Sequence, residues 1–287
     1  MTPIRRRSLA AAALAVLALT VTACTPGGDA EPTAAPIVVE KDLTYPGGDG
    51  SALGVDACRP DDDTAHPAVV LVHGGAFSEG DRTTMAGVCS ELAKNGYAAF
   101  AVDYRQLPAT YPAQIDDVQA SVLWLREPEQ VERFRLSSTV SLLGSSAGAI
   151  ISLSTAAALA GNDAPVASVV ALSPAGSLTA DAAELGDPRP DLEKVVLGYL
   201  GCDVITDCPI AEQASPVASA ALLPPTLIVH GTDELIPLAQ AELLDDALST
   251  DGIEHELVVV DGTRHGLQLL DSAVKADVIE FLGAHAS

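Results

Sequence analysis

Basic and aromatic side chains are scarce in this 287-residue chain. Lys and Arg number 15 against 39 Asp and Glu, and the aromatic residues are one Trp, five Tyr and four Phe. A chain without a basic stripe releases no counterions from phosphates, which excludes nucleic acid as a partner. So few aromatic rings argue against a broad sugar-stacking platform. The hydrophobic share of 48% excludes a disordered polyanion, because it is enough to build a core.

The N-terminal segment is expected to be an export signal rather than part of the fold. Arg5, Arg6 and Arg7 precede an uncharged stretch, residues 9–20, that is rich in Ala and Leu and short for a membrane span. We therefore predict a signal peptide at residues 1–23. The arginines fit either general or twin-arginine export.

Cys24 follows Val21-Thr22-Ala23, which resembles the lipobox of bacterial lipoproteins. A lipidated Cys24 would anchor the protein to the cell membrane, whereas an ordinary cleavable signal would release it as a secreted protein. Residues 24–36 are rich in Pro, Gly, Ala and Thr without an apolar period, which predicts a flexible tether. The folded domain is then expected at residues 37–287.

The other four cysteines predict two disulfides in an exported chain, with three possible connectivities. Cys202 and Cys208 are six positions apart beside Gly201, so a local bridge between them closes easily. That pairing would leave Cys58 with Cys89. The sequence has no CxxC motif and no Cys/His cluster, so no metal site is expected.

From residue 37 onward, short apolar runs alternate with helical stretches. Two strands, 37–45 and 52–58, are expected to form a hairpin around a glycine-rich turn. The buried runs at 68–72, 97–102, 140–143, 166–172, 226–229 and 257–260 are typical of strands covered on both faces. Helices are expected near 83–95, 112–126, 147–160, 237–250 and 267–284. This order predicts a doubly wound α/β fold with a mostly parallel sheet. The long irregular interval 173–224 is interpreted as a cap-like insertion over the ligand-binding edge.

Gly144-Ser145-Ser146-Ala147-Gly148 follows a predicted strand and opens an Ala-rich helix, which is the context that a GxSxG nucleophile elbow requires. Two flanking glycines permit the tight turn that exposes Ser146. The helix N-terminus behind it supplies free N–H groups where an oxyanion would form. Ser145 also carries a hydroxyl, but it precedes the apex of the turn.

His73-Gly74-Gly75-Ala76-Phe77 follows another predicted strand. Paired glycines let successive N–H groups face one point, so Gly75 and Ala76, together with Ala147, are the predicted oxyanion donors. His73 has no acid partner in its motif and is assigned to orienting this loop.

The nucleophile needs a base and an acid that fixes the tautomer of that base. His265 lies in a loop after the last predicted strand. Asp233 lies in the equivalent loop one strand earlier, so the order Ser146, Asp233, His265 is that of an α/β-hydrolase. The other histidines lie at strand starts (His66, His255), at the chain end (His285) or in the acid's own loop (His230).

These motifs together resemble those of the α/β-hydrolase superfamily, close to secreted bacterial carboxylesterases of the hormone-sensitive-lipase and feruloyl/acetyl-esterase-like group. The resemblance covers nearly all of residues 37–287. It rests on HGGAF at 73–77, Val102-Asp103-Tyr104-Arg105, GSSAG at 144–148, Ala214-Ser215-Pro216, HGTDELIP at 230–237 and the final His265-Gly266. The resemblance implies a structural role for Asp116 or Asp117, and neither is assigned to catalysis.

Three departures from the family pattern stand out. Ala76 replaces the third glycine of HGGG, Ala149 replaces a further glycine after the elbow, and the acid loop is one residue short. Asp233 keeps the family's spacing to Ile236 and Pro237, so it is the predicted acid, with Glu234 as the alternative.

The resemblance implies two-step hydrolysis of a carboxylic ester with short or medium acyl groups, without metal or organic cofactor. The substrate would be a small molecule or an esterified polysaccharide, and Phe77 and Tyr104 are expected to shape its pocket. A prolyl-oligopeptidase-like peptidase and a catalytically silent surface binding module are the alternatives. The first normally carries an N-terminal propeller, for which this chain has no room, and the second does not need an intact catalytic set.

Overall fold

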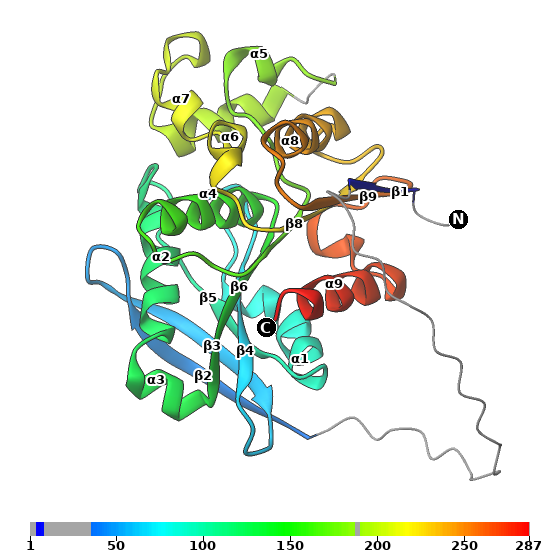
Figure 1. The fold of residues 1–287 in the computed structure, drawn as a ribbon. Helices are drawn as coiled ribbons and strands as arrows, with labels where there is room; N and C mark the ends of the chain where they lie inside the picture. The colour runs from blue at the N-terminus through cyan, green and yellow to red at the C-terminus, as the bar shows by residue number, and fades with distance from the viewer. Residues whose placement is uncertain (1–3, 9–35, 187–189, 287) are drawn as a thin grey trace, which may run out of the picture.

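The computed structural model describes residues 4–8, 36–186 and 190–286. Within them one sheet runs in the order β1-β9-β8-β7-β6-β4-β5-β3-β2 (Figure 1). The strands are β1 (Ile4–Ser8), β2 (Ile37–Pro46), β3 (Ala52–Pro60), β4 (His66–Val72), β5 (Ala98–Val102), β6 (Leu136–Ser145), β7 (Val169–Leu172), β8 (Thr226–Gly231) and β9 (His255–Val260). The six central strands, β9, β8, β7, β6, β4 and β5 in their order in the sheet, pair in parallel with one another. The outer strands β1, β2 and β3 pair antiparallel with their neighbours.

Helices cover both faces of this sheet, as the predicted α/β fold requires. They are α1 (Ala86–Lys94), α2 (Ala113–Leu125), α3 (Pro128–Phe134), α4 (Ala147–Gly161), α5 (Ala180–Ala183), α6 (Pro190–Leu200), α7 (Ile210–Gln213), α8 (Leu238–Asp251) and α9 (Ser272–Ala284). Short 3-10 turns add η1 (Arg82–Met85), η2 (Ile205–Asp207), η3 (Pro216–Leu222) and η4 (Gly266–Leu269). The doubly wound fold and its N-terminal hairpin are confirmed, while α3 and the early start of β6 were not predicted.

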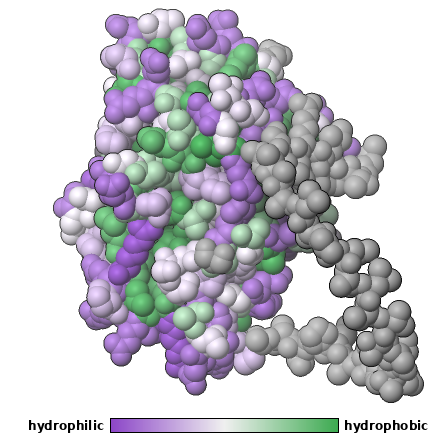
Figure 2. All heavy atoms as spheres, viewed as in Figure 1, coloured by the Kyte–Doolittle hydropathy of each residue, from purple (hydrophilic) through white to green (hydrophobic). Residues whose placement is uncertain are grey.

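Strand β4 shows why the central runs are continuously apolar. Val70 and Val72 belong to the core under α2, α4 and α8, whereas Val69 and Leu71 belong to the core under α1 and α9. Successive strand side chains point to opposite faces, so a strand buried on both sides needs an apolar residue at every position. On the face drawn in Figure 2, hydrophilic side chains surround smaller hydrophobic areas.

The parallel register brings the functional loops to one edge of the sheet. Val72 at the end of β4 pairs with Gly144 of β6, Ser145 pairs with Leu172 at the end of β7, and Leu172 pairs with Val229 of β8. The carboxyl ends of these strands therefore lie in line, and ligands bind at this edge in open α/β sheets.

The interval 173–224 is not irregular, which corrects the sequence prediction. It contains α5, α6, η2, α7 and η3 in its described residues, and Figure 1 shows this insertion stacked at the top of the molecule beyond α4 and α8. Its position over the carboxyl edge agrees with a cap. α5 and α7 were missed because they have only four residues each, which is too short for an apolar period. α6 does carry a helical period, with apolar residues at 192, 195, 196, 199 and 200, which the sequence analysis overlooked.

Both disulfides favoured by the cysteine spacing are present, Cys58 with Cys89 and Cys202 with Cys208. Cys24 and residues 25–35 of the tether lie outside the described residues. Residues 4–8, inside the expected signal peptide, form the edge strand β1 beside β9; the signal peptide and the lipid anchor stay predictions. None of the described helices is long and apolar enough to cross a membrane.

Candidate active site

Ser146 occupies the sharp turn between β6 and α4. Its backbone has φ 55° and ψ −121°, a conformation that L-residues rarely adopt, and its N–H donates to the carbonyl of Leu172 at 2.8 Å. Such strain persists only where the surrounding structure imposes it, and it concentrates at active sites. Ser146 and Ala147 line a cavity, whereas Ser145 does not. The structure therefore favours Ser146 over Ser145 as the exposed hydroxyl.

Glycine is required on both sides of this turn. A Cβ on Gly144 would lie 2.1 Å from the carbonyl oxygen of Gly148, and a Cβ on Gly148 would lie 2.2 Å from that of Val72. Both separations are far below van der Waals contact. The GxSxG spacing thus follows from the close packing of α4 against β4 and β6.

The loop after β4 lies directly against Ser146. A Cβ on Gly74 would come within 3.1 Å of the Ser146 Cβ. Gly75, Ala76 and Phe77 all have positive φ, at 122°, 51° and 60°. Gly75 must be glycine, because a Cβ there would lie 1.9 Å from the Glu79 carbonyl oxygen. Ala76 tolerates the left-handed conformation and lines the cavity with Ser146.

His73 supports this loop from inside, as its lack of an acid partner predicted. Its ring is fully buried and stacks on Tyr104 with centroids 4.4 Å apart. Burial lowers the pKa of His73 below its usual 6.5, so the ring is neutral at pH 7. Its Nδ1–H donates to the Gly74 carbonyl at 2.7 Å, because a carbonyl oxygen only accepts.

Tyr104 is not where the sequence analysis placed it. Its side chain is 3% exposed, its hydroxyl donates to the His73 carbonyl at 3.0 Å, and it is not among the residues that line the cavity. The expectation that Tyr104 shapes the substrate pocket is therefore wrong. Tyr104 braces the backbone from which the loop 74–77 departs. Phe77 does line the cavity, with its ring stacked on Tyr199 at 3.8 Å.

The acid that meets His265 is Glu234. Glu234 Oε2 accepts a short hydrogen bond from His265 Nδ1, and the Glu234 side chain is fully buried. Asp233 is exposed, and its carboxylate accepts from the Thr232 hydroxyl at 3.1 Å. The structure thus contradicts the prediction of Asp233 and selects the alternative.

The reason lies in how the loop is anchored. Its start is fixed by β8, and Gly231 N donates to Glu234 Oε1 at 3.0 Å, which closes the turn three residues after the strand. The acid is therefore positioned by its distance from His230 and Gly231. The sequence prediction of Asp233 rested on its spacing to Pro237. This spacing was misleading, because the residue that is missing from this loop relative to the family pattern is missing after the acid and not before it.

His230 completes this carboxylate's environment, and sequence reasoning missed it. It is fully buried, and its Nδ1–H lies 2.8 Å from Glu234 Oε1 and 2.9 Å from the Gly231 carbonyl. Burial alone would raise the pKa of Glu234, but the hydrogen bonds from His230 and His265 outweigh it and lower the pKa to about 2. Glu234 is therefore ionised at neutral pH, between two imidazoles.

His265 itself is brought to the elbow by its neighbour. Gly266 has φ 57°, and a Cβ there would lie 2.4 Å from Ser145 Oγ, while Gly266 N donates to Ser173 Oγ at 2.7 Å. The loop after β9 thus packs against the residue that precedes Ser146. The His265 side chain is 22% exposed.

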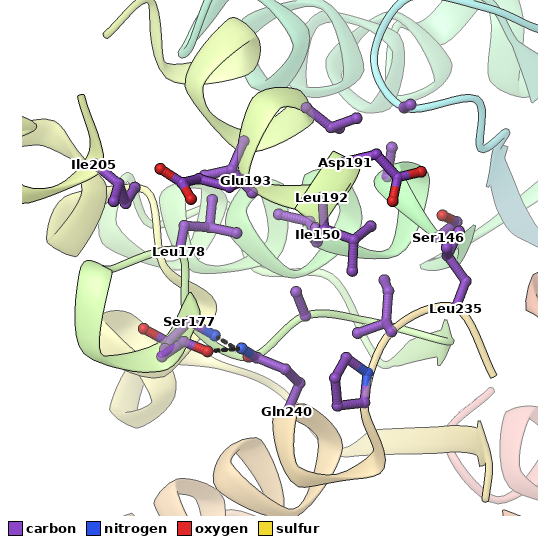
Figure 3. Close-up of a pocket in the computed structure, with 18 of the residues that line it drawn as sticks. Ser146, Ile150, Ser177, Leu178, Asp191, Leu192, Glu193, Ile205, Leu235 and Gln240 are labelled. Carbon is purple, nitrogen blue, oxygen red and sulfur yellow. Dashed lines mark hydrogen bonds between the residues drawn. The ribbon is translucent and has the colours of Figure 1, made fainter. Parts of the chain in front are cut away.

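The cavity beside Ser146 has a volume of about 580 Å³. Figure 3 shows it extending from Ser146 toward Ser177, Gln240 and Ile205. Most of its wall is aliphatic or aromatic: Phe77, Ile150, Leu178, Leu192, Val195, Val196, Ile205, Leu235 and Ile236. Pockets of this size and character bind small organic molecules through apolar contact, with a few polar groups fixing orientation.

Asp117 has the structural role that the resemblance implied. Its buried carboxylate accepts from Gly48 N at 2.8 Å and from Arg105 N at 2.8 Å, and it pairs with the Arg105 guanidinium. It ties the β2–β3 turn to the segment after β5. Among the described residues no group of three or more His, Cys, Asp and Glu is arranged to hold a metal ion.

Comparison with known proteins agrees with this geometry. A protein-family model described as BD-FAE matches residues 56–248, more than half of the chain. The chain belongs to the BD-FAE family. The esterase of Pyrobaculum calidifontis shares the fold of this BD-FAE chain at a TM-score of 0.73 and 26% identity, over 87% of this chain and 86% of that one. The resemblance to α/β-hydrolase carboxylesterases is thereby confirmed.

Curated relatives of the BD-FAE chain are also named as esterases. Esterase LipQ of Mycobacterium tuberculosis is 27% identical over 232 residues, which cover 74% of this chain and 53% of LipQ. Carboxylic ester hydrolase LipN of the same organism is 31% identical over 113 residues, 39% of this chain and 30% of LipN. The chain thus spans about half or less of the length of these relatives.

Proposed function

We propose that this chain is a serine carboxylic-ester hydrolase that acts through an acyl-enzyme on esters with short or medium acyl groups. The observation that carries the proposal is the buried Glu234–His265 pair in a loop packed against the elbow of Ser146, with an apolar cavity opening at that serine. These are the acid, base, nucleophile and binding pocket of acyl transfer.

In the first step Ser146 Oγ attacks the ester carbonyl carbon while His265 Nε2 takes its proton. Glu234 holds the other ring nitrogen as Nδ1–H and stabilises the imidazolium that forms. Negative charge collects on the carbonyl oxygen, where the backbone N–H groups of Gly75, Ala76 and Ala147 are the proposed donors. The carbon–oxygen bond to the alcohol then breaks, and the alcohol leaves with the proton from His265.

In the second step water attacks the acyl carbon. His265 takes the proton of that water and returns it to Ser146 Oγ as the acyl–serine bond breaks. The products are a carboxylic acid, an alcohol and free enzyme. No step requires a group that these residues do not supply.

The test compares Ser146→Ala with Ser145→Ala in hydrolysis of p-nitrophenyl acetate and butyrate by the purified protein. Removing the nucleophile costs about 10⁶-fold in kcat, so Ser146→Ala should retain almost nothing, whereas Ser145→Ala should retain measurable turnover. Undiminished turnover in Ser146→Ala would overturn the proposal. Turnover of dipeptide p-nitroanilides without ester turnover would favour the peptidase alternative.

We further propose that the enzyme is exported and anchored to the cell membrane through lipidated Cys24, with secretion as the alternative. The lipobox-like sequence and the Pro- and Gly-rich tether support this. Labelling of cells with a palmitate analogue should mark the wild type and not Cys24→Ser. Undiminished label on Cys24→Ser would contradict the anchor.

The alcohol half of the substrate is proposed to be a small molecule or a polysaccharide. An acetylated and a feruloylated glycan, assayed beside p-nitrophenyl esters, distinguish the two. Release of acid from either glycan at a rate comparable with the small esters would support a polysaccharide substrate, and release only from the small esters would contradict it.

A further inference from the structure

The end of the cavity away from Ser146 is formed by a small closed loop. In Figure 3 the labelled Ile205 lies at the opposite end of the pocket from Ser146. Ile205 belongs to the segment 202–208, whose two ends are joined by the disulfide between Cys202 and Cys208. One residue of the pocket lining is therefore carried by a covalent ring of the chain.

Between the two cysteines of this ring, Ile205 is the one residue that packs inward. Asp203, Val204, Thr206 and Asp207 are exposed, whereas Ile205 is half-buried and packs against the main hydrophobic core. The exposed Val204 beside it, at 52%, shows that apolar character alone does not bury a residue here. The ring thus presents one aliphatic side chain to the cavity.

The ring has few other restraints among the described residues. Cys202 N donates to the Leu197 carbonyl at 3.1 Å, Asp207 N donates to the Val204 carbonyl at 3.1 Å, and Ala211 N donates to the Cys208 carbonyl at 3.0 Å. The first and last of these hold the two ends of the ring, and the second lies within it. The position of Ile205 therefore depends on the disulfide that joins those ends and on the packing of Ile205 against the core.

We propose that Ile205, held by the disulfide-closed ring 202–208, sets the length of the aliphatic chain that the pocket accepts. The inference rests on the proposed ester hydrolysis. A chain that extends from the carbonyl at Ser146 along the apolar wall meets Ile205 last. Chains that end before Ile205 are bound, and longer ones must displace it or bend out of the pocket.

The first test measures kcat/KM on p-nitrophenyl esters from acetate to decanoate, and on acetates of alkanols of the same lengths. Ile205→Ala should shift the preferred length toward longer chains in one ladder, and Ile205→Phe should shift it toward shorter ones. One methylene in an apolar pocket discriminates by about 10-fold or more, so the octanoate-to-butyrate ratio should change by about that factor. The ladder that shifts identifies whether the pocket holds the acyl or the alkyl chain.

Val204→Ala is the matched control, because it truncates the neighbouring side chain on the exposed side of the same ring. It should keep the parental length profile. Unchanged profiles in both ladders for Ile205→Ala and Ile205→Phe would overturn the proposal, as would an equal shift in Val204→Ala.

The second test removes the covalent ring itself. Cys202→Ala/Cys208→Ala should broaden the length profile, because Ile205 can then move aside. Cys58→Ala/Cys89→Ala removes the disulfide between β3 and α1, and its length profile should stay parental even if its melting temperature falls. A parental profile in the first double variant would contradict the role of the ring.

Failure of this inference is distinguishable from failure of the proposed function. If the wild type hydrolyses no ester in a Ser146-dependent manner, the function itself is wrong. If the wild type is an active esterase and its length profile is insensitive to Ile205, only the inference fails.

Discussion

The assignment of Glu234 as the acid leads to a sharp prediction from two adjacent residues. In Glu234→Gln one carboxylate oxygen becomes an NH₂ group. The oxygens accept from His230 Nδ1 and Gly231 N on one side and from His265 Nδ1 on the other, so the NH₂ group must face a donor. If it faces His265, that ring loses the partner that fixes its tautomer. Loss of the acid in this way costs about 10⁴-fold in kcat, or about 5.5 kcal/mol of transition-state stabilisation.

Asp233→Asn is the matched control. Asp233 is exposed, and among the described residues its carboxylate meets only the hydroxyl of Thr232, at 3.1 Å. Its turnover of p-nitrophenyl butyrate should stay within about threefold of the wild type, since exposed charges contribute little. Circular dichroism and melting temperature would confirm that both variants fold. A large loss in Asp233→Asn together with near-normal turnover in Glu234→Gln would refute the reasoning.

Three further predictions follow from the same contacts. Tyr104→Phe keeps the stacking on His73 but removes the hydrogen bond to the His73 carbonyl, so it should lower the free energy of unfolding by about 1 kcal/mol and lower ester turnover. Its preference for ester chain length should stay that of the wild type. An altered preference would indicate that Tyr104 does contact the substrate. Gly148→Ala should prevent accumulation of folded protein, because its Cβ would lie 2.2 Å from the Val72 carbonyl oxygen. Gly161→Ala is the control in the same helix and should fold normally, because its Cβ would meet open space. Equal yields of folded protein from the two variants would contradict the close packing at Gly148. The pKa of Glu234 lies at about 2 against an ordinary 4.5, so between these pH values the unfolded state binds more protons and the folded state is stabilised above pH 4.5 but loses this stabilisation as the pH falls toward 2. The melting temperature of Glu234→Gln should therefore depend less on pH in that window than the melting temperature of the wild type. Parallel curves of melting temperature against pH would argue against the depressed pKa.

The elements that carry the site were predictable because their signals are local. The apolar runs of β4 and β6 are continuous, and the glycines at 144, 148 and 75 are each demanded by a close backbone approach that no other residue fits. A close backbone approach of this kind permits only glycine at the position, so the motif is conspicuous in the sequence. The turn of Ser146 and the loop of His265 could therefore be placed from motif and chain order alone.

The acid and Tyr104 were mispredicted because their roles depend on directions that the sequence does not encode. Asp233 and Glu234 are neighbours, and only the turn closed by Gly231 N decides which one faces His265. Tyr104 follows β5 by two positions and could point to either side of the loop; its hydroxyl turns to the His73 carbonyl instead of the cavity. His230 went unrecognised because its partner was misassigned.

The most direct test of the central claim is the mass of the intact protein after reaction with a fluorophosphonate, followed by peptide mapping. A hydroxyl activated by a neighbouring imidazole is phosphonylated, whereas an ordinary serine is not. The proposed mechanism predicts one adduct per chain, located on Ser146, abolished in Ser146→Ala and strongly slowed in Glu234→Gln. No adduct on the folded wild type, or an adduct on Ser145, would contradict it.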